Sequence, residues 1–206
     1  MGQITDGVRS VLSCPMLYDG LQRLMGAKAG RQELVSRFIR PGEGSRILDV
    51  GCGTAEILSY LPIGVKYFGY DVSAEYVEAA KRRFGARGEF RCSSIEGEKL
   101  KLLPQFDIVL AIGVLHHLDD AEAIKLFEVA HQALRGKGRF VAIDPCLADD
   151  QNSIARLLIR LDRGQNVRSA QGYEAIAREI FPKVEGTLLH RRMIPYTHWI
   201  MECSPC

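Results

Sequence analysis

The feature that most constrains the fold is a short apolar run that leads straight into a glycine turn. Residues Arg46–Val50 are mostly apolar, and Gly51 and Gly53 follow at once. Glycine lets the backbone bend tightly and leaves room where a Cβ would block a ligand. A helix is expected directly after the turn, at Ala55–Leu61, and Pro62 should end it. A strand, a glycine turn and a helix in this order predict an α/β domain with a ligand at the turn.

The rest of the chain alternates between strand-length apolar runs and helix-length amphipathic segments, which predicts βαβ units and a parallel sheet. The expected strands are Arg46–Val50, Lys66–Tyr70, Glu89–Cys92, Phe106–Ile112, Arg139–Ile143, Gly186–His190 and Thr197–Cys203. Further helices are expected at Ala74–Phe84, Ala121–Leu134, Ser153–Arg163 and Gly172–Ile180. The last two strands leave no room for a helix between them, so they should form a hairpin with one antiparallel strand.

These elements define the fold class as α/β, with a doubly wound, Rossmann-like sheet. The sheet should have seven strands, mostly parallel with one antiparallel strand, and helices on both faces. A chain of 206 residues fits a single domain of this kind. Open α/β sheets bind their ligands at the edge where the parallel strands end, which directs attention to the residues that follow each strand.

Acidic residues at this edge separate two classes of ligand. Asp71 ends the second strand twenty residues after Gly51, where a carboxylate can bind both ribose hydroxyls of an adenosine. A nicotinamide dinucleotide would use the same layout. However, Glu56 stands where the dinucleotide fingerprint has a small residue, and Asp49 adds a second carboxylate at the strand end. Both would repel a pyrophosphate and attract a sulfonium and an ammonium group, so a cationic adenosyl ligand is favoured.

The run Arg46–Glu56 resembles the first motif of the class I S-adenosylmethionine-dependent methyltransferases. Further motifs of that family are similar, in the same order, to Gly69–Ser73, Phe106–Val109, Val114–Leu118 and Leu134–Arg139. A match of several motifs in order is much more specific than a lone glycine turn. The resemblance implies that S-adenosylmethionine is the cofactor and that the chain transfers its methyl group to a small-molecule acceptor. Oxygen is the expected methylated atom only because it is a common one.

The same resemblance implies roles for residues after the first and second strands. Gly51, Cys52 and Gly53 would hold the methionine part of the cofactor, and Asp49 would contribute to binding its ammonium group. Asp71 would bind the ribose.

Other positions follow from the later motifs. Val72 would lie against the adenine ring, and Ile112 and Gly113 would border the methionine chain through their backbone. Ser94 and Ile95 stand where the family commonly has Asp and a small or apolar residue. This departure would weaken the contact with adenine, because Ser carries no charge.

His116 and His117, just after the fourth strand, are the candidate catalytic residues. Methyl transfer is an in-line displacement, and it needs a general base only when the acceptor holds its proton tightly. In small-molecule members of the family one ring of such a pair often only packs over the cofactor. A base at this pair therefore stays optional, and His117 is preferred.

Several basic residues have two readings. Arg31 could pair with the cofactor carboxylate, although a surface or helix-capping role explains it equally well. The expected helix Ser153–Arg163 has arginines on one face and aliphatic residues on the other. Its basic face could receive an acceptor carboxylate or phosphate, but a solvated surface is the more common situation.

The resemblance and the element order divide the domain 1–206 into four parts. Residues 1–40 should form an N-terminal helical cap, and residues 46–144 the cofactor-binding core. Residues 145–170 are expected to be a lid insertion. Residues 171–206 then supply the final helix and the C-terminal hairpin.

Composition narrows the partners. A net charge of +2 and the absence of a basic arm argue against a nucleic-acid acceptor. No apolar run is long enough to span a bilayer, so we expect no membrane insertion and a cytoplasmic location. Cys203 and Cys206 supply only half of a zinc site, so no metal is expected. An NAD-type oxidoreductase and a catalytically inactive cofactor-binding module stay as alternatives, and the oligomeric state is open.

Overall fold

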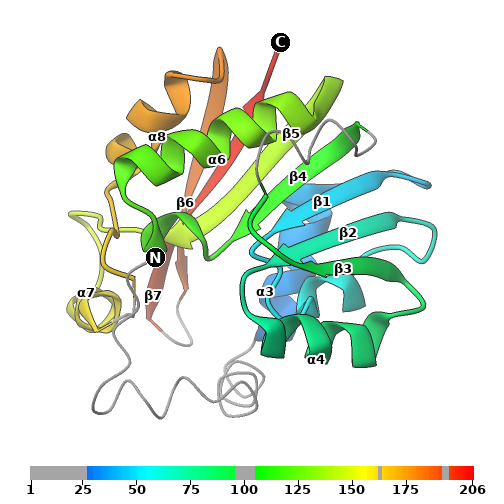
Figure 1. Ribbon diagram of the computed structural model, residues 1–206. Helices are drawn as coiled ribbons and strands as arrows, with labels where there is room; N and C mark the ends of the chain where they lie inside the picture. Colours follow the sequence, from blue (N-terminus) through cyan, green and yellow to red (C-terminus); the bar gives the residue numbers. More distant parts are fainter. Residues whose placement is uncertain (1–26, 96–104, 162–163, 192–194) are drawn as a thin grey trace.

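The computed structural model describes residues 27–95, 105–161, 164–191 and 195–206. Its strands are β1 (Arg46–Val50), β2 (Lys66–Asp71), β3 (Gly88–Cys92), β4 (Phe106–Ile112), β5 (Leu134–Pro145), β6 (Lys183–Arg191) and β7 (Tyr196–Ser204). They form one sheet in the order β3-β2-β1-β4-β5-β7-β6 (Figure 1). Among the described strands, β7 alone runs against the others, because it is antiparallel to both β5 and β6. The predicted fold class is confirmed.

Helices cover both faces of the sheet. The α-helices are α3 (Ala27–Leu34), α4 (Ala74–Phe84), α6 (Asp120–Ala133), α7 (Ser153–Arg160) and α8 (Ala170–Arg178), and α3 continues into a π-helix, η1 (Val35–Ile39). Leu48 of β1 lies in a core cluster with buried residues of α6 and α8. Its neighbour Ile47 points to the other face, where the core includes residues of η1 and α4. Figure 1 shows these two layers on opposite sides of the sheet.

The helix expected at Ala55–Leu61 is the one element that was wrong in kind. The structure has a single 3-10 turn there, η2 (Glu56–Ser59). Ala55 adopts a left-handed conformation with φ of 56°, so a helix cannot begin at it. The guanidinium of Arg87 donates hydrogen bonds to the carbonyls of Leu58 (2.9 Å) and Leu61 (3.2 Å), which holds the segment in its irregular path.

Helix α7 is shorter than expected, and its aliphatic face is the exposed one. Its buried residues are Ala155 and Ile159, and Arg156 donates a hydrogen bond of 2.8 Å to the carbonyl of Ala148. The exposed large apolar side chains of this stretch are Ile154, Leu157, Leu158 and Leu161, and Arg160 is exposed as well. The sequence therefore predicted an amphipathic helix, but it did not predict which face of the helix packs against the protein. Arg163 lies outside the described residues.

Helices α3 and η1 cross one face of the sheet from edge to edge. Glu33 of α3 binds Arg191 at the carboxyl end of β6, with 2.8 Å between the charged atoms. At the far end, Arg139 of β5 donates a hydrogen bond of 3.0 Å to the carbonyl of Arg40. The described part of the expected cap thus begins beside the edge where parallel strands end. Residues 1–26 lie outside the described part, so the cap as a whole stays a prediction.

Candidate functional site

Glycines with positive φ shape the edge where β1 and β4 end. Gly51, Gly53 and Gly113 have φ angles of 72°, 53° and 71°. A Cβ on Gly51 would lie 2.6 Å from Val114 Cγ2, so sterics and backbone conformation both require glycine. The N–H groups of Gly51 and Cys52 donate to the carbonyl of Tyr70, at 2.7 and 3.0 Å. These bonds fix the turn against β2.

Asp71 connects this turn to the start of α4. Its carboxylate accepts hydrogen bonds from the N–H of Gly53 (2.9 Å) and of Ser73 (2.8 Å). Each carboxylate oxygen can accept a second hydrogen bond, so a pair of ribose hydroxyls can still be bound there. The next residue, Val72, is a large apolar side chain left exposed. An exposed apolar residue beside a ribose acceptor fits the flat face of an adenine ring.

Asp49 is the buried carboxylate of the site. The hydroxyl of Tyr67 donates to its Oδ2, whereas its Oδ1 accepts no hydrogen bond from any residue that the structure describes. Burial raises the pKa of Asp49 to about 7, and the nearby charge of Asp71 also raises it, against the hydrogen bond from Tyr67. An ammonium group would supply the missing donor and a compensating charge. The residues present therefore fit the α-amino end of S-adenosylmethionine.

The other expected cofactor residues lie on the same elements with less specific geometry. The thiol of Cys52 is buried, and burial raises its pKa well above the usual range. A Cβ on Gly69 would lie only 2.8 Å from the Cys52 sulfur, so this side chain supports the turn from beneath. Ser94 is exposed and Ile95 is half-buried against the core.

The residues at the end of β4 and in α3 complete the set. Ile112 is half-buried, and the N–H of Gly113 donates to the carbonyl of Ile143 at 2.7 Å. Arg31 is half-buried in the last turn of α3, and its role at the cofactor stays a prediction.

The two histidines lie on a short 3-10 helix, η3 (Leu115–His117), after Gly113. The His116 side chain is only 7% exposed, and its Nδ1 lies 2.7 Å from Asp144 Oδ1. The same oxygen accepts the backbone N–H of His116 at 3.1 Å. His117 is half-buried, and its ring centroid lies 4.0 Å from that of His116. The two rings therefore differ in their access to solvent. His116 is buried, and His117 is partly exposed.

Sequence reasoning missed Asp144. It is buried near the end of β5, and burial raises the pKa of its carboxyl group against the opposing effect of His116. The signal that selected Asp49 and Asp71, an acidic residue at the end of a parallel strand, would have found it.

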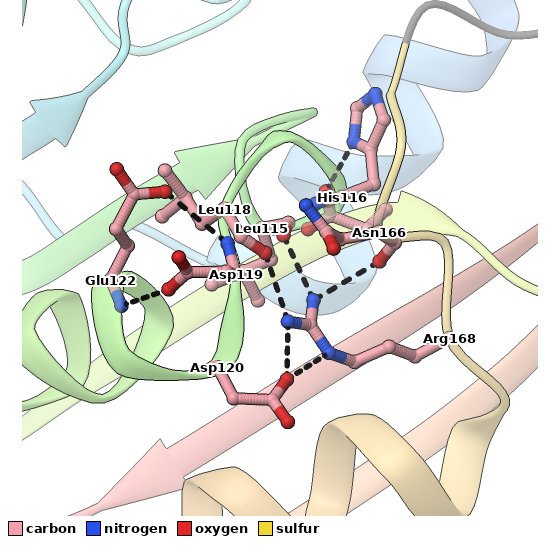
Figure 2. Close-up of polar contacts among 9 residues, drawn as sticks. Leu115, His116, Leu118, Asp119, Asp120, Glu122, Asn166 and Arg168 are labelled. Atoms are coloured by element: carbon pink, nitrogen blue, oxygen red, sulfur yellow. Dashed lines mark hydrogen bonds and ion pairs between the residues drawn. The ribbon is translucent and has the colours of Figure 1, made fainter. Parts of the chain in front are cut away.

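Arg168 in the segment after α7 was also missed. Figure 2 shows its guanidinium directed at the turn that carries the histidines. It donates hydrogen bonds to the carbonyls of Leu115 (3.0 Å) and Leu118 (2.9 Å), and it pairs with Asp120 at 2.7 Å. Asn166 N–H donates to the carbonyl of His116 at 2.9 Å. The described part of the expected lid therefore lies against the turn, and we refer to Leu115–Leu118 as the histidine turn.

Gly164 in the same segment has no room for a side chain. A Cβ there would lie 2.0 Å from His116 Cδ2 and 2.7 Å from the carbonyl oxygen of His116. We expect Gly164→Ala to destabilise the protein by about 1–3 kcal/mol, the usual cost of overpacking, as measured by thermal or urea unfolding. Gly136→Ala is the matched control, because nothing lies within 4 Å of a Cβ at that position. Equal stability of the two variants would contradict the packing of Gly164 on His116.

No group of three or more His, Cys, Asp or Glu side chains within the described residues lies at the spacing of a metal site. No described helix is both long and apolar enough to cross a membrane.

A family model described as "Methyltransferase domain" matches residues 48–140. A ubiquinone/menaquinone biosynthesis C-methyltransferase of Geotalea uraniireducens is 30% identical over 138 residues, covering 62% of this chain and 57% of that protein. A ubiquinone biosynthesis O-methyltransferase of Bradyrhizobium sp. is 35% identical over 85 residues, covering 39% and 32%. The chain thus spans less than two thirds of the length of these curated relatives.

Solved structures share the fold at low identity. The S-adenosylmethionine-dependent methyltransferase SibL superposes with a TM-score of 0.73 at 16% identity, covering 96% of this chain and 60% of that one. Human N-acetylserotonin methyltransferase, solved with S-adenosylmethionine, has a TM-score of 0.65 at 20% identity, covering 93% and 57%.

These matches agree with the order of the motifs and with the acidic glycine turn, and they leave no reason to retain the NAD-type alternative. Together, the methyltransferase-domain model, the curated relatives and the shared fold support a class I S-adenosylmethionine-dependent methyltransferase, with S-adenosylmethionine as the methyl donor.

Proposed function

We propose that this chain transfers a methyl group from S-adenosylmethionine to a hydroxyl oxygen on the aromatic ring of a small molecule. The observation that carries the proposal is the pairing of a donor site with a candidate base at one edge of the sheet. The buried Oδ1 of Asp49 can accept a hydrogen bond from an ammonium group. The ring of His117 follows Gly113 at the end of the neighbouring strand β4. Relatives named ubiquinone biosynthesis O-methyltransferases support a ring hydroxyl as the acceptor.

The donor is held by the residues that follow β1 and β2. Asp49 would bind its ammonium group through the buried Oδ1, and the backbone of Gly51, Cys52 and Gly53 would surround its methionine chain. Asp71 accepts the ribose hydroxyls. The remaining contacts come from Val72, Ser94 and Ile95 at the adenine, Ile112 and Gly113 at the methionine chain, and Arg31 at the carboxylate.

His117 acts as the general base. A phenolic hydroxyl has a pKa near 10, so it keeps its proton at neutral pH and attacks slowly without help. When bound, S-adenosylmethionine supplies a methyl group on a positively charged sulfur, and this sulfur becomes the neutral thioether of the leaving group. His117 takes the hydroxyl proton as the oxygen–carbon bond forms. Because Nδ1 of His117 is buried, we assign this proton to Nε2.

The test is a binding measurement followed by an acceptor screen. Isothermal titration should detect S-adenosylmethionine and S-adenosylhomocysteine but not NAD. A screen of phenols, catechols and hydroquinones should then release S-adenosylhomocysteine, and the product should carry a methoxy carbon by NMR. A new methyl group on ring carbon would replace the oxygen assignment, as the relative named a C-methyltransferase allows. Binding with no turnover across the screen would favour the inactive module.

The role of Asp71 has its own test. Asp71→Ala should weaken S-adenosylhomocysteine binding roughly 10- to 150-fold, because hydrogen bonds to a charged group contribute about 1.5–3 kcal/mol. Titration calorimetry measures the change. Glu75→Ala is the matched control, since Glu75 is an exposed carboxylate four residues further on, in the first turn of α4. An unchanged dissociation constant for the Asp71 variant would remove this residue from the site.

A further inference from the structure

The histidine turn is held from two sides by charged groups that the donor and the acceptor do not use. From β5, Asp144 accepts the backbone N–H of His116 and binds its ring. From the segment before α8, Arg168 donates to the carbonyls at both ends of the turn, Leu115 and Leu118. Asp144 therefore binds a backbone N–H of the turn, and Arg168 binds two of its backbone carbonyls, as Figure 2 shows for Arg168.

Asp144 is buried, and Arg168 is mostly shielded from water, although Asp120, its partner in the ion pair, is exposed. Asp144 is 2% exposed as a residue, and the Arg168 side chain is 12% exposed. Burying a charged group is costly unless it is paired and hydrogen-bonded. Both side chains form hydrogen bonds with the backbone of the turn itself. Their directional hydrogen bonds fix where the turn lies.

The fixed position is passed on to His117 through ring contact. The His116 ring has its Nδ1 on Asp144, and its carbon Cε1 lies 3.8 Å from the Cβ position of Gly113. On its other side, Gly164 approaches Cδ2 so closely that no side chain fits. The ring of His116 therefore has little freedom, and it contacts the ring of His117 in a tilted arrangement, with 4.0 Å between the ring centroids and 39° between the ring planes. The orientation of His117 is limited in turn.

We propose that Asp144 and Arg168 are positioning residues for the methyl transfer. Together they hold the histidine turn so that His117 meets the acceptor hydroxyl. Neither residue touches the acceptor or the donor. This inference rests on the proposed role of His117 as the base. It gives the described part of the lid a function beyond covering the site, since Arg168 belongs to that segment.

Asp144→Asn and Arg168→Lys are the informative variants. Asparagine keeps an oxygen for the backbone N–H of His116 but loses the charge that orients the ring. Lysine keeps the positive charge of Arg168 but lacks the planar fork that reaches two carbonyls. Asp120→Asn is the control. It removes only the charge of the ion-pair partner of Arg168, and the side chain of Asp120 is 75% exposed.

The experiment uses the full chain, with catechol as the acceptor probe, and records the kinetics, the S-adenosylhomocysteine affinity, the His117 ring signals and rescue by guanidinium. We expect kcat to fall roughly 10- to 100-fold in both variants, within the contribution of a positioned base, while the KM for catechol and the S-adenosylhomocysteine affinity change less than about threefold. In the ligand-free protein, the ¹H–¹⁵N signals of the His117 ring should shift in both variants and stay in place in Asp120→Asn. Guanidinium added to Arg168→Ala should restore part of the rate.

Two results would overturn the proposal. His117 ring signals that stay unchanged in both variants would show that the turn does not depend on these residues. A rate loss that only follows a fall in melting temperature or in S-adenosylhomocysteine affinity would reduce them to structural residues. If the wild type methylates neither catechol nor any other phenol, catechol or hydroquinone of the screen, the proposed acceptor class is wrong, whereas the ring signals still report whether Asp144 and Arg168 position His117.

Discussion

Replacing Asp49 with asparagine should make the ligand-free protein more stable at pH 8 while weakening its hold on S-adenosylmethionine. Burial raises the pKa of Asp49 from 3.8 to about 7, so the folded protein resists ionising this group. A carboxyl group whose pKa is raised by folding favours the folded state at pH values below its unfolded pKa. This contribution to the free energy of unfolding is lost as the pH rises from that value to about 7. At pH 8 the loss amounts to about 4 kcal/mol of the free energy of unfolding. It does not occur in the asparagine variant, because asparagine does not ionise.

Urea unfolding of the ligand-free protein at two pH values measures the effect. At pH 4 the wild type carries a largely protonated Asp49, which resembles asparagine, so the two proteins should unfold at similar urea concentrations. At pH 8 the variant should be clearly more stable. Its affinity for S-adenosylmethionine should fall at least about tenfold, because the ammonium group loses its charged partner. A stability difference that is equal at the two pH values would contradict a buried, ionisable Asp49.

His117→Ala should lower kcat by about 10²- to 10⁴-fold, the usual contribution of a general base. The dissociation constant of S-adenosylhomocysteine should not change, because the proposed donor site consists of residues after β1 and β2. His131→Ala is the control, since His131 lies in the last turn of α6 and packs edge-to-face on Phe181, with 5.3 Å between the ring centroids.

Imidazole provides a second measurement on the same variant. Added imidazole should recover part of the lost rate in His117→Ala and leave the wild type unaffected, because it replaces the missing base. Full retention of kcat in His117→Ala would show that the acceptor needs no base. A rate loss accompanied by loss of donor binding would instead indicate that the ring packs over the cofactor.

The sheet and the glycine turn after β1 could be predicted because local patterns determine them. The alternation of strands and helices fixes the sheet, and glycines at positions 51 and 53 with acidic neighbours mark the turn. The hairpin of β6 and β7 follows from the short connection between the two strands. These features depend on residues close together in the chain, so a single sequence reveals them.

The features that were missed depend on contacts between distant residues. Arg87 donates a hydrogen bond to the carbonyl of Leu58, within the segment that forms a single 3-10 turn where a helix was expected. Arg168 and Asp144 meet the histidine turn from segments 50 and 28 residues away. The inward side of α7 is likewise set by what it packs on, and the spacing of its leucines says nothing about that. Long-range contacts of this kind leave no period in the sequence.

The place of β7 in the sheet limits when the domain can be completed during synthesis. β7 lies between β5 and β6, although it is the last of the three to leave the ribosome. Until it emerges, β5 and β6 each keep an unpaired edge that can associate with other chains. A stop codon anywhere before Tyr196 would therefore cost more than one strand, because β6 would lose its only neighbour among the described strands.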